Sequence, residues 1–216
     1  MLKVSHLGID IGGAHLKVIG VDKRNKVVLV DYESCAIWEG IEKLKAKFRK
    51  INNIINNNSV KCGITMSGEM CDNFKNRHIG AKILTKECDN LRFNNFFYVN
   101  SKEVFTKKPN YKHLISLNWH SIGRFLENKI ENCIAIDFGS TTTDFICIKN
   151  NKIVNRFSDD YSRINNAELL YTGFTRTPIF GVTNQIDYKK KKLRIIPEFF
   201  SNTSDIYRVL GRLDKK

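Results

Sequence analysis

The sequence predicts an α/β protein made of two similar lobes, and two related segments carry that prediction. Residues 134–145 read IAIDFGSTTTDF, an apolar run that ends in an acid and continues into small and hydroxylated residues. A weaker copy, LGIDIGGAHLK, opens the chain at residues 7–17. Either segment alone would also fit an ordinary β-hairpin, but an architectural repeat favours two lobes. We expect one lobe over residues 1–130 and a second over 131–216.

Bulk composition limits the class of protein. The 216 residues are 42% hydrophobic, enough for a packed core in one large domain or two small lobes. The sequence has no run of eighteen apolar residues, so no membrane span is expected. The start of the chain lacks a signal-peptide pattern. The six cysteines form no C-x-x-C pair and no zinc-site spacing. We therefore expect a cytoplasmic protein with reduced thiols and no membrane partner.

The net charge of +14 would suit nucleic acid or a small anionic substrate. The positive charge accompanies a general enrichment in Lys, Asn and Ile, and only residues 189–192 form a dense lysine run. The sequence shows no zinc-finger, RRM or helix-turn-helix pattern. We therefore do not expect nucleic acid as a partner, and an anion such as a diphosphate is favoured.

Strand and helix patterns alternate along the chain. Residues 7–11, 16–21 and 27–30 predict an antiparallel meander. Residues 38–55 carry apolar side chains at helical spacing and precede a buried strand at 60–66. Further helices are expected at 74–87, 114–129 and before residue 211, and further strands at 93–99, 134–138, 143–149, 152–157 and 193–196.

The first repeat places charged groups around a glycine turn. Asp10 ends a strand just before Gly12 and Gly13, and Lys17 follows the turn closely enough to reach an anion held there. Taken alone, this spacing is a weak to moderate indication of a phosphate site, and His15 is interpreted as a turn residue.

The second repeat is richer in groups that hold anions. Asp137 ends the apolar strand, where a carboxylate can reach a hydrated cation, and Gly139 gives the turn conformational freedom. Ser140, Thr141 and Thr142 then offer successive backbone N–H groups and hydroxyls. This segment is the stronger of the two predicted phosphate turns.

Two other loops contain candidate site residues. Glu69 and Asp72 follow a strand and are three residues apart, so they would share a helix face if a helix begins there. Acids at a helix start are also common for structural reasons alone. Arg176 lies between two threonines, where a guanidinium could clamp phosphate or carboxylate, or could serve only to hold its loop.

Five segments in this order resemble the hydantoinase/oxoprolinase-like proteins of the tetrahydromethanopterin-linked one-carbon pathway. They are residues 8–17, 65–70, 118–119, 137–144 and 170–178. This family, which includes a methanofuran-biosynthesis synthase, belongs to the actin, sugar kinase and Hsp70 (ASKHA) superfamily. The resemblance implies duplicated lobes of the actin-like ATPase or ribonuclease H-like fold. Members of the family continue beyond the segment that ends here, so the resemblance also implies an incomplete, C-terminally short second lobe.

The resemblance implies a transferase of methanofuran-type cofactor biosynthesis. Such an enzyme joins a furan-methyl diphosphate to a phenolic, tyramine- or tyrosine-derived amine and releases pyrophosphate. Site roles then follow for the residues that match. Magnesium is implied at Asp10, Asp137 and Asp144; catalysis at Glu69 and Asp72; substrate contact at Asn118, Thr172 and Gly173; and phosphate binding at Gly12, Gly13, Lys17, Gly139, Ser140, Thr141, Thr142 and Arg176. No organic cofactor is expected, and a homo-oligomer is left open.

Two other functions remain open on the same residues. Related hairpins hold ATP phosphates elsewhere in the superfamily, so an ATP-binding kinase or hydrolase is one alternative, although the second half shows no clear adenosine-contact motif. A non-catalytic assembly subunit of one-carbon metabolism is the other, which the basic charge favours and the retained acids oppose.

Overall fold

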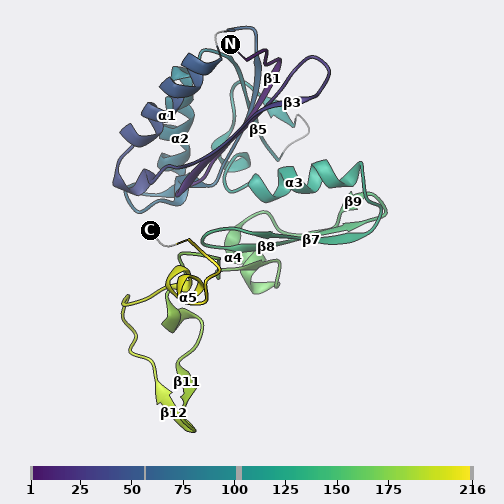
Figure 1. Ribbon diagram of the computed structural model, residues 1–216. Helices are drawn as coiled ribbons and strands as arrows, with labels where there is room; N and C mark the ends of the chain where they lie inside the picture. Colours follow the sequence, from purple (N-terminus) through teal and green to yellow (C-terminus); the bar gives the residue numbers. More distant parts are fainter. Residues whose placement is uncertain (1, 56, 101–103, 215–216) are drawn as a thin grey trace. The chain divides into compact units, whose positions relative to one another are not determined.

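The computed structural model describes residues 2–55, 57–100 and 104–214. The chain divides into two compact units, Met1–Ile122 and Gly123–Lys216. The division falls within helix α3 (Asn118–Glu127). Each unit has a sheet of its own (Figure 1).

The first unit is built on a six-stranded mixed sheet of order β3-β2-β1-β4-β5-β6. The strands are β1 (His6–Ile11), β2 (His15–Val21), β3 (Val27–Ser34), β4 (Lys61–Met66), β5 (Asn94–Tyr98) and β6 (Phe105–Thr106). β1, β2 and β3 form the predicted antiparallel meander, whereas β4 pairs in parallel with β1 and β5 with β4. This order confirms the predicted α/β class.

Two helices cover one face of that sheet. Figure 1 shows α1 (Glu42–Ile54) and α2 (Arg77–Glu87) together on the same side of the strands. Strand β1 alternates buried and more open residues, so Leu7, Ile9 and Ile11 point into the core beneath the helices. Leu44 and Phe48 of α1 belong to the same core. Burial of this apolar stripe stabilises the helix on the sheet.

Several predicted helix starts move by a few residues. The region predicted to begin a helix at residue 38 first forms a 3-10 turn, Ile37–Glu39, and α1 follows it. α2 begins at Arg77 rather than residue 74, because the Asn76 side chain accepts a hydrogen bond from the Ile79 N–H and caps the helix. α3 begins at Asn118 rather than residue 114, after a 3-10 turn at Tyr111–His113.

The second unit repeats the opening meander on a smaller scale. β7 (Cys133–Phe138) and β8 (Thr143–Lys149) are antiparallel neighbours, and β9 (Lys152–Ile153) and β10 (Leu169–Leu170) each pair with β8. α4 (Asp160–Asn165) precedes β10. The predicted strand 152–157 is therefore only two residues long, since Asn155 turns its side chain to hydrogen bond with the backbone of β8.

The end of the chain adds a hairpin and a short helix. The predicted strand near residue 193 is β12 (Lys191–Arg194), and it pairs with β11 (Gln185–Tyr188), which the sequence did not indicate. α5 (Thr203–Val209) is capped by Asn202 and Asp205 in a capping box. Among the described residues, no helix has the length and apolar character needed to cross a membrane.

Candidate functional site

The first turn pairs its acid with its lysine. Asp10 and Lys17 lie directly opposite each other in the β1–β2 register, and Lys17 Nζ is 3.0 Å from Asp10 Oδ2. Gly12 N–H closes the turn by donating to His15 O at 3.0 Å. Within the described ranges, the N–H groups of Gly13 and Ala14 donate to no protein acceptor. Both N–H groups can therefore donate to an anion at this turn.

The second turn offers one more donor. Gly139 N–H donates to Thr142 O at 2.9 Å and closes the loop between β7 and β8. The N–H groups of Ser140, Thr141 and Thr142 donate to no acceptor in the part of the chain that the structure describes. Three successive free N–H groups in a tight turn form a site suited to phosphate oxygens.

Two acids face each other beneath this turn. Asp137 and Asp144 are directly opposite in the β7–β8 register, so their side chains lie on the same face of the sheet. Asp137 is half-buried and Asp144 is buried. Two carboxylates at this spacing provide the oxygen ligands that Mg²⁺ prefers.

A buried arginine already engages one of these acids. Arg163 of α4 donates to Asp144 Oδ1 at 2.6 Å and to Glu168 O at 3.0 Å. Burial raises the pKa of the Asp144 carboxyl, while the guanidinium of Arg163 pulls that pKa the other way. Sequence reasoning missed Arg163, because its partner lies nineteen residues earlier and only the fold brings them together. A cation bound at Asp144 would share that carboxylate with Arg163.

The loop at residues 172–177 packs onto the second turn. Phe174 N–H donates to Gly139 O and Arg176 N–H to Ser140 O, each at 2.9 Å. Thr143 Oγ1 donates to Thr172 O at 2.6 Å. A Cβ on Gly173 would lie 2.5 Å from backbone atoms of the turn. The structure therefore places Thr172, Gly173 and Arg176 at the predicted phosphate turn, and the Arg176 side chain is exposed.

The acids of the 67–72 loop do not share a helix face, so that expectation is wrong. The 3-10 turn Gly68–Met70 ends before Asp72, which is exposed, whereas Glu69 is completely buried. Ser116 Oγ donates to Glu69 Oε1 at 2.8 Å and accepts from Arg77 at 3.1 Å. These bonds tie the Glu69 loop to Ser116 and Arg77, and the catalytic role predicted for Glu69 stays a prediction.

Asp72 has a different setting from Glu69. It follows Cys71, whose Sγ would lie 2.9 Å from a Cβ built on Gly13. The exposed acid is thus next in sequence to a residue that packs on the first turn. Asn118, predicted to contact substrate, begins α3, and its carbonyl accepts a hydrogen bond from Ser121 Oγ at 2.6 Å.

The three aspartates predicted to hold magnesium are divided between the units, Asp10 in the first and the other two in the second. No cluster of three or more His, Cys, Asp or Glu side chains arranged for a metal occurs among the described residues. The three-aspartate magnesium site therefore stays a prediction.

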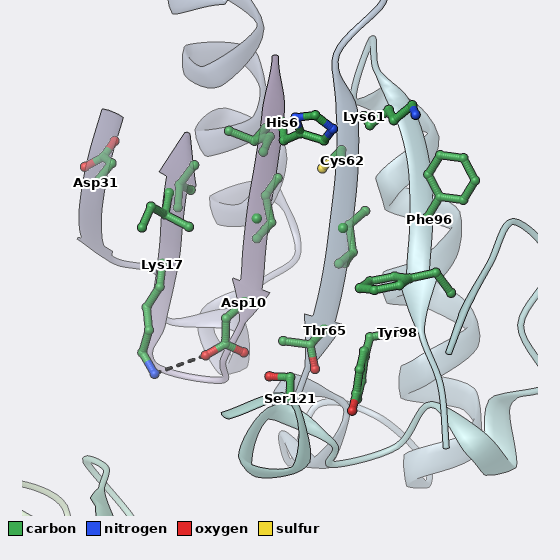
Figure 2. Close-up of a pocket in the computed structure, with 18 of the residues that line it drawn as sticks. His6, Asp10, Lys17, Asp31, Lys61, Cys62, Thr65, Phe96, Tyr98 and Ser121 are labelled. Atoms are coloured by element: carbon green, nitrogen blue, oxygen red, sulfur yellow. Dashed lines mark hydrogen bonds and ion pairs between the residues drawn. The ribbon is translucent and has the colours of Figure 1, made fainter. Parts of the chain in front are cut away.

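An apolar trough lies on the open face of the first sheet. It has a volume of about 830 Å³ and is shown in Figure 2. Its floor contains Gly8 and Gly63, which are direct neighbours across β1 and β4. Ile19 lies beside Gly8 and Phe96 beside Gly63. Sequence analysis did not predict this trough, because its floor comes from glycines on two strands far apart in the chain.

Charged and hydroxyl groups lie at the two ends of this trough. Figure 2 shows Asp10, Thr65 and Tyr98 at one end and His6 and Lys61 at the other. Thr65 Oγ1 is buried and has no hydrogen-bond partner in the described structure. A buried hydroxyl without a partner is costly, so a ligand that bonds to it would gain affinity.

The second half of the chain matches a known family. Residues 119–216 match the hydantoinase/oxoprolinase family model. This stretch contains the second turn, Arg163 and the 172–177 loop, so the match covers the region where the phosphate-type geometry is most complete.

Two relatives carry the same specific name, (4-{4-[2-(gamma-L-glutamylamino)ethyl]phenoxymethyl}furan-2-yl)methanamine synthase. The protein from Methanocaldococcus jannaschii is 29% identical over 224 aligned residues, which cover 100% of this chain and 64% of the relative. The protein from Methanococcus vannielii is 40% identical over 87 residues, which cover 40% of this chain and 39% of the relative. These matches confirm the resemblance predicted from the sequence, and the chain spans less than two thirds of either relative.

Solved structures give more distant likenesses. An exopolyphosphatase from Cytophaga hutchinsonii is 12% identical with a TM-score of 0.44, over 75% of this chain and 53% of that one. The ethanolamine utilization protein EutJ from Carboxydothermus hydrogenoformans is 14% identical with a TM-score of 0.42, over 71% and 50% of the two chains.

Proposed function

We propose that this protein takes part in methanofuran-type cofactor biosynthesis as a transferase that forms an aryl ether. The name of the relatives describes a phenoxymethyl group on a furan that also carries a methanamine arm. This ether consists of a phenol oxygen joined to the methylene carbon of a furan-methyl group. A diphosphate on the methylene carbon would make it an electrophile with a good leaving group.

The proposed step is a substitution at the methylene carbon. The bond from the phenol oxygen to the methylene forms, and the bond from the methylene to the diphosphate oxygen breaks. The electron pair leaves with the diphosphate, and the phenol proton passes to a carboxylate. We assign that proton to Asp72, because it is exposed, and we give Glu69 a positioning role because it is buried.

The observation that carries the proposal is the second turn. Its three free N–H groups can bind the diphosphate and stabilise the charge that develops as it leaves. Arg176, whose backbone is bonded to this turn, provides a cation for the same charge. In the first unit, Lys17 and the Gly12–Gly13 turn are likewise assigned to phosphate binding.

The carboxylates facing each other under the turn fit a magnesium ion. Asp137 and Asp144, both in the second unit, would hold it. When bound, Mg²⁺ would neutralise diphosphate charge. The protein's own contribution is to place the two acids opposite each other and to keep Asp144 oriented through Arg163.

The experiment measures pyrophosphate release from a furan-methyl diphosphate with γ-L-glutamyltyramine as the phenol. Asp137→Ala should reduce the rate about 100-fold or more, because charge stabilisation at a leaving group is worth several kcal/mol. Asp187→Ala, in the exposed β11–β12 hairpin, is the matched control and should leave the rate unchanged. Full turnover in Asp137→Ala would refute the metal and diphosphate roles.

The same preparation tests the other two functions. ATP hydrolysis without pyrophosphate release from the furan substrate would favour the ATP-binding alternative. Neither activity, together with specific capture of a one-carbon enzyme, would favour an assembly subunit.

A further inference from the structure

We propose that the trough on the first sheet binds the aryl ring of the phenolic acceptor, with the phenol hydroxyl at the Asp10–Thr65 end. This inference rests on the proposed function for the identity of the ligand. It concerns residues that no part of the phosphate-binding geometry uses, apart from the Asp10–Lys17 pair at one end of the trough.

The middle of the trough is apolar and contains an aromatic ring of the protein. Gly8 and Gly63 are neighbours on adjacent strands and have no side chains of their own, and the ring of Phe105 lies over Gly63. Ile19 and Phe96 rise on either side of the glycines and form apolar walls.

The free space above these glycines is limited by close neighbours. A Cβ on Gly63 would lie 3.2 Å from the ring of Phe105, and a Cβ on Gly8 would lie 3.1 Å from Ile19 Cγ2. Phe105 is half-exposed, at 53% of its surface, and its ring also meets Tyr98 edge-on with the ring centres 5.5 Å apart. A ligand ring in the trough would pack against the exposed surface of the Phe105 ring, which is favourable.

The two ends of the trough orient the ligand. At one end the buried Thr65 hydroxyl lacks a partner in the described structure, and a phenol hydroxyl can supply one. At the other end His6 and Lys61 lie opposite each other in the strand register. His6 is four residues from Asp10 along β1, and Lys61 is four residues from Thr65 along β4, so the two ends are about 13 Å apart at the rise of a strand. This basic end suits the carboxylate of a glutamyl arm.

This polarity favours a small ligand over a protein partner. An apolar sheet face can also bind a helix or a second copy of the chain. Such a partner would meet an apolar surface with polar groups only at its rim, and it would leave Thr65 Oγ1 unbonded unless a polar group were placed there. A phenol with a carboxylate at its far end matches the trough along its whole length.

The first experiment measures binding of γ-L-glutamyltyramine to the full chain by isothermal titration calorimetry, without the diphosphate substrate. Gly63→Val displaces the Phe105 ring that lies over the glycine and should weaken binding at least about tenfold, as overpacking in a fitted site commonly does. Gly181→Val is the matched control, since its Cβ would meet only ordinary contacts at 3.6 Å or more. Circular dichroism verifies that each variant is folded.

A second variant keeps the test decisive if Gly63→Val misfolds. Thr65→Val removes the hydroxyl and keeps the shape. The wild type should bind the phenol about three- to tenfold more tightly than the phenyl analogue without the hydroxyl, the size expected for one hydrogen bond. Thr65→Val should lose that preference while its affinity for the phenyl analogue stays the same.

Three results would overturn the inference. The first is that the wild type does not bind the phenol. The second is that Gly63→Val and Thr65→Val both bind the phenol as tightly as the wild type does. The third is that the chain binds no phenol but self-associates, and that Ile19→Glu abolishes this self-association. The pyrophosphate assay separates this inference from the proposed function. Binding in the trough without pyrophosphate release would refute only the transferase, and full release by a folded Gly63→Val variant would refute only the trough.

Discussion

The two turns share one plan but neutralise their acids in different ways. In the first unit, the partner of Asp10 is Lys17, whose side chain keeps 48% of its surface exposed. In the second unit, the partner of Asp144 is Arg163, whose side chain is only 1% exposed. Both acids lie next to a turn with free N–H groups, so the difference concerns the cation and its access to water.

The difference in exposure means that the Lys17 ammonium can change partners, whereas the Arg163 guanidinium cannot. An exposed ion pair adds about 0–1 kcal/mol, so Lys17 can leave Asp10 for a phosphate at little cost. A buried pair is held because either group alone would be a buried charge without compensation. Under the proposed function, the first turn would supply a mobile cation to an anion bound there, and the second would supply a rigid frame for its N–H groups.

Arg163→Met should have the largest effect. It leaves Asp144 buried without its cation, and we expect the second unit to lose about 3–5 kcal/mol of stability. Hydrogen exchange of residues 143–149 reports the free energy of opening this unit. Arg156→Met, at an exposed position in the same unit, is the control and should change it by less than about 0.5 kcal/mol. Equal exchange in both variants would show that the buried pair does not hold the unit together.

The same variant should respond to pH in a defined direction. Without Arg163 the pKa of Asp144 rises further. The folded state then binds a proton more tightly than the unfolded chain, in which the pKa of an aspartate is about 3.9. The variant is then most stable below that value and loses stability as the pH rises through the raised pKa. Its deficit relative to the wild type should shrink towards pH 4, and adding Asp144→Asn should remove this dependence. A deficit that does not vary with pH would exclude Asp144 as the cause.

Gly173→Ala tests the packing of the loop on the second turn. The added Cβ would lie 2.5 Å from backbone atoms of Ser140 and Thr141, so the loop must move away. We expect a loss of about 1–3 kcal/mol in the second unit and weaker binding of inorganic pyrophosphate. Gly181→Ala, whose Cβ would make only ordinary contacts at 3.6 Å or more, should change neither quantity. Unchanged pyrophosphate affinity in Gly173→Ala would separate the loop from the anion site.

Lys17→Ala should change stability least. Because the pair is exposed, the free energy of unfolding should change by about 0–1 kcal/mol. Calorimetry should nevertheless show weaker pyrophosphate binding, by a few-fold, and a reduced dependence of that binding on salt. Lys43→Ala, which removes the exposed pair with Glu39, should leave pyrophosphate binding unchanged. A large loss of stability in Lys17→Ala would contradict the contrast between the two turns.

Much of the fold was predictable because strands and helices leave periodic patterns. Leu7, Ile9 and Ile11 alternate with open positions, and the apolar residues of α1 recur every three or four positions, so both elements were expected. The 185–188 strand was missed because its side chains are all exposed and show no buried face. The burial of Glu69 was missed because it depends on Ser116, forty-seven residues later.

Local sequence by itself determined the two strand–acid–turn units, since glycine, hydroxyl residues and flanking apolar runs specify a tight turn within about ten residues. It therefore indicated the anion-holding groups of both turns. Only the tertiary structure decided which cation accompanies each acid, that Glu69 supports a loop, and that two glycines form the floor of a trough. Those features join residues on different elements, and a contact between elements leaves no periodic pattern in either segment alone.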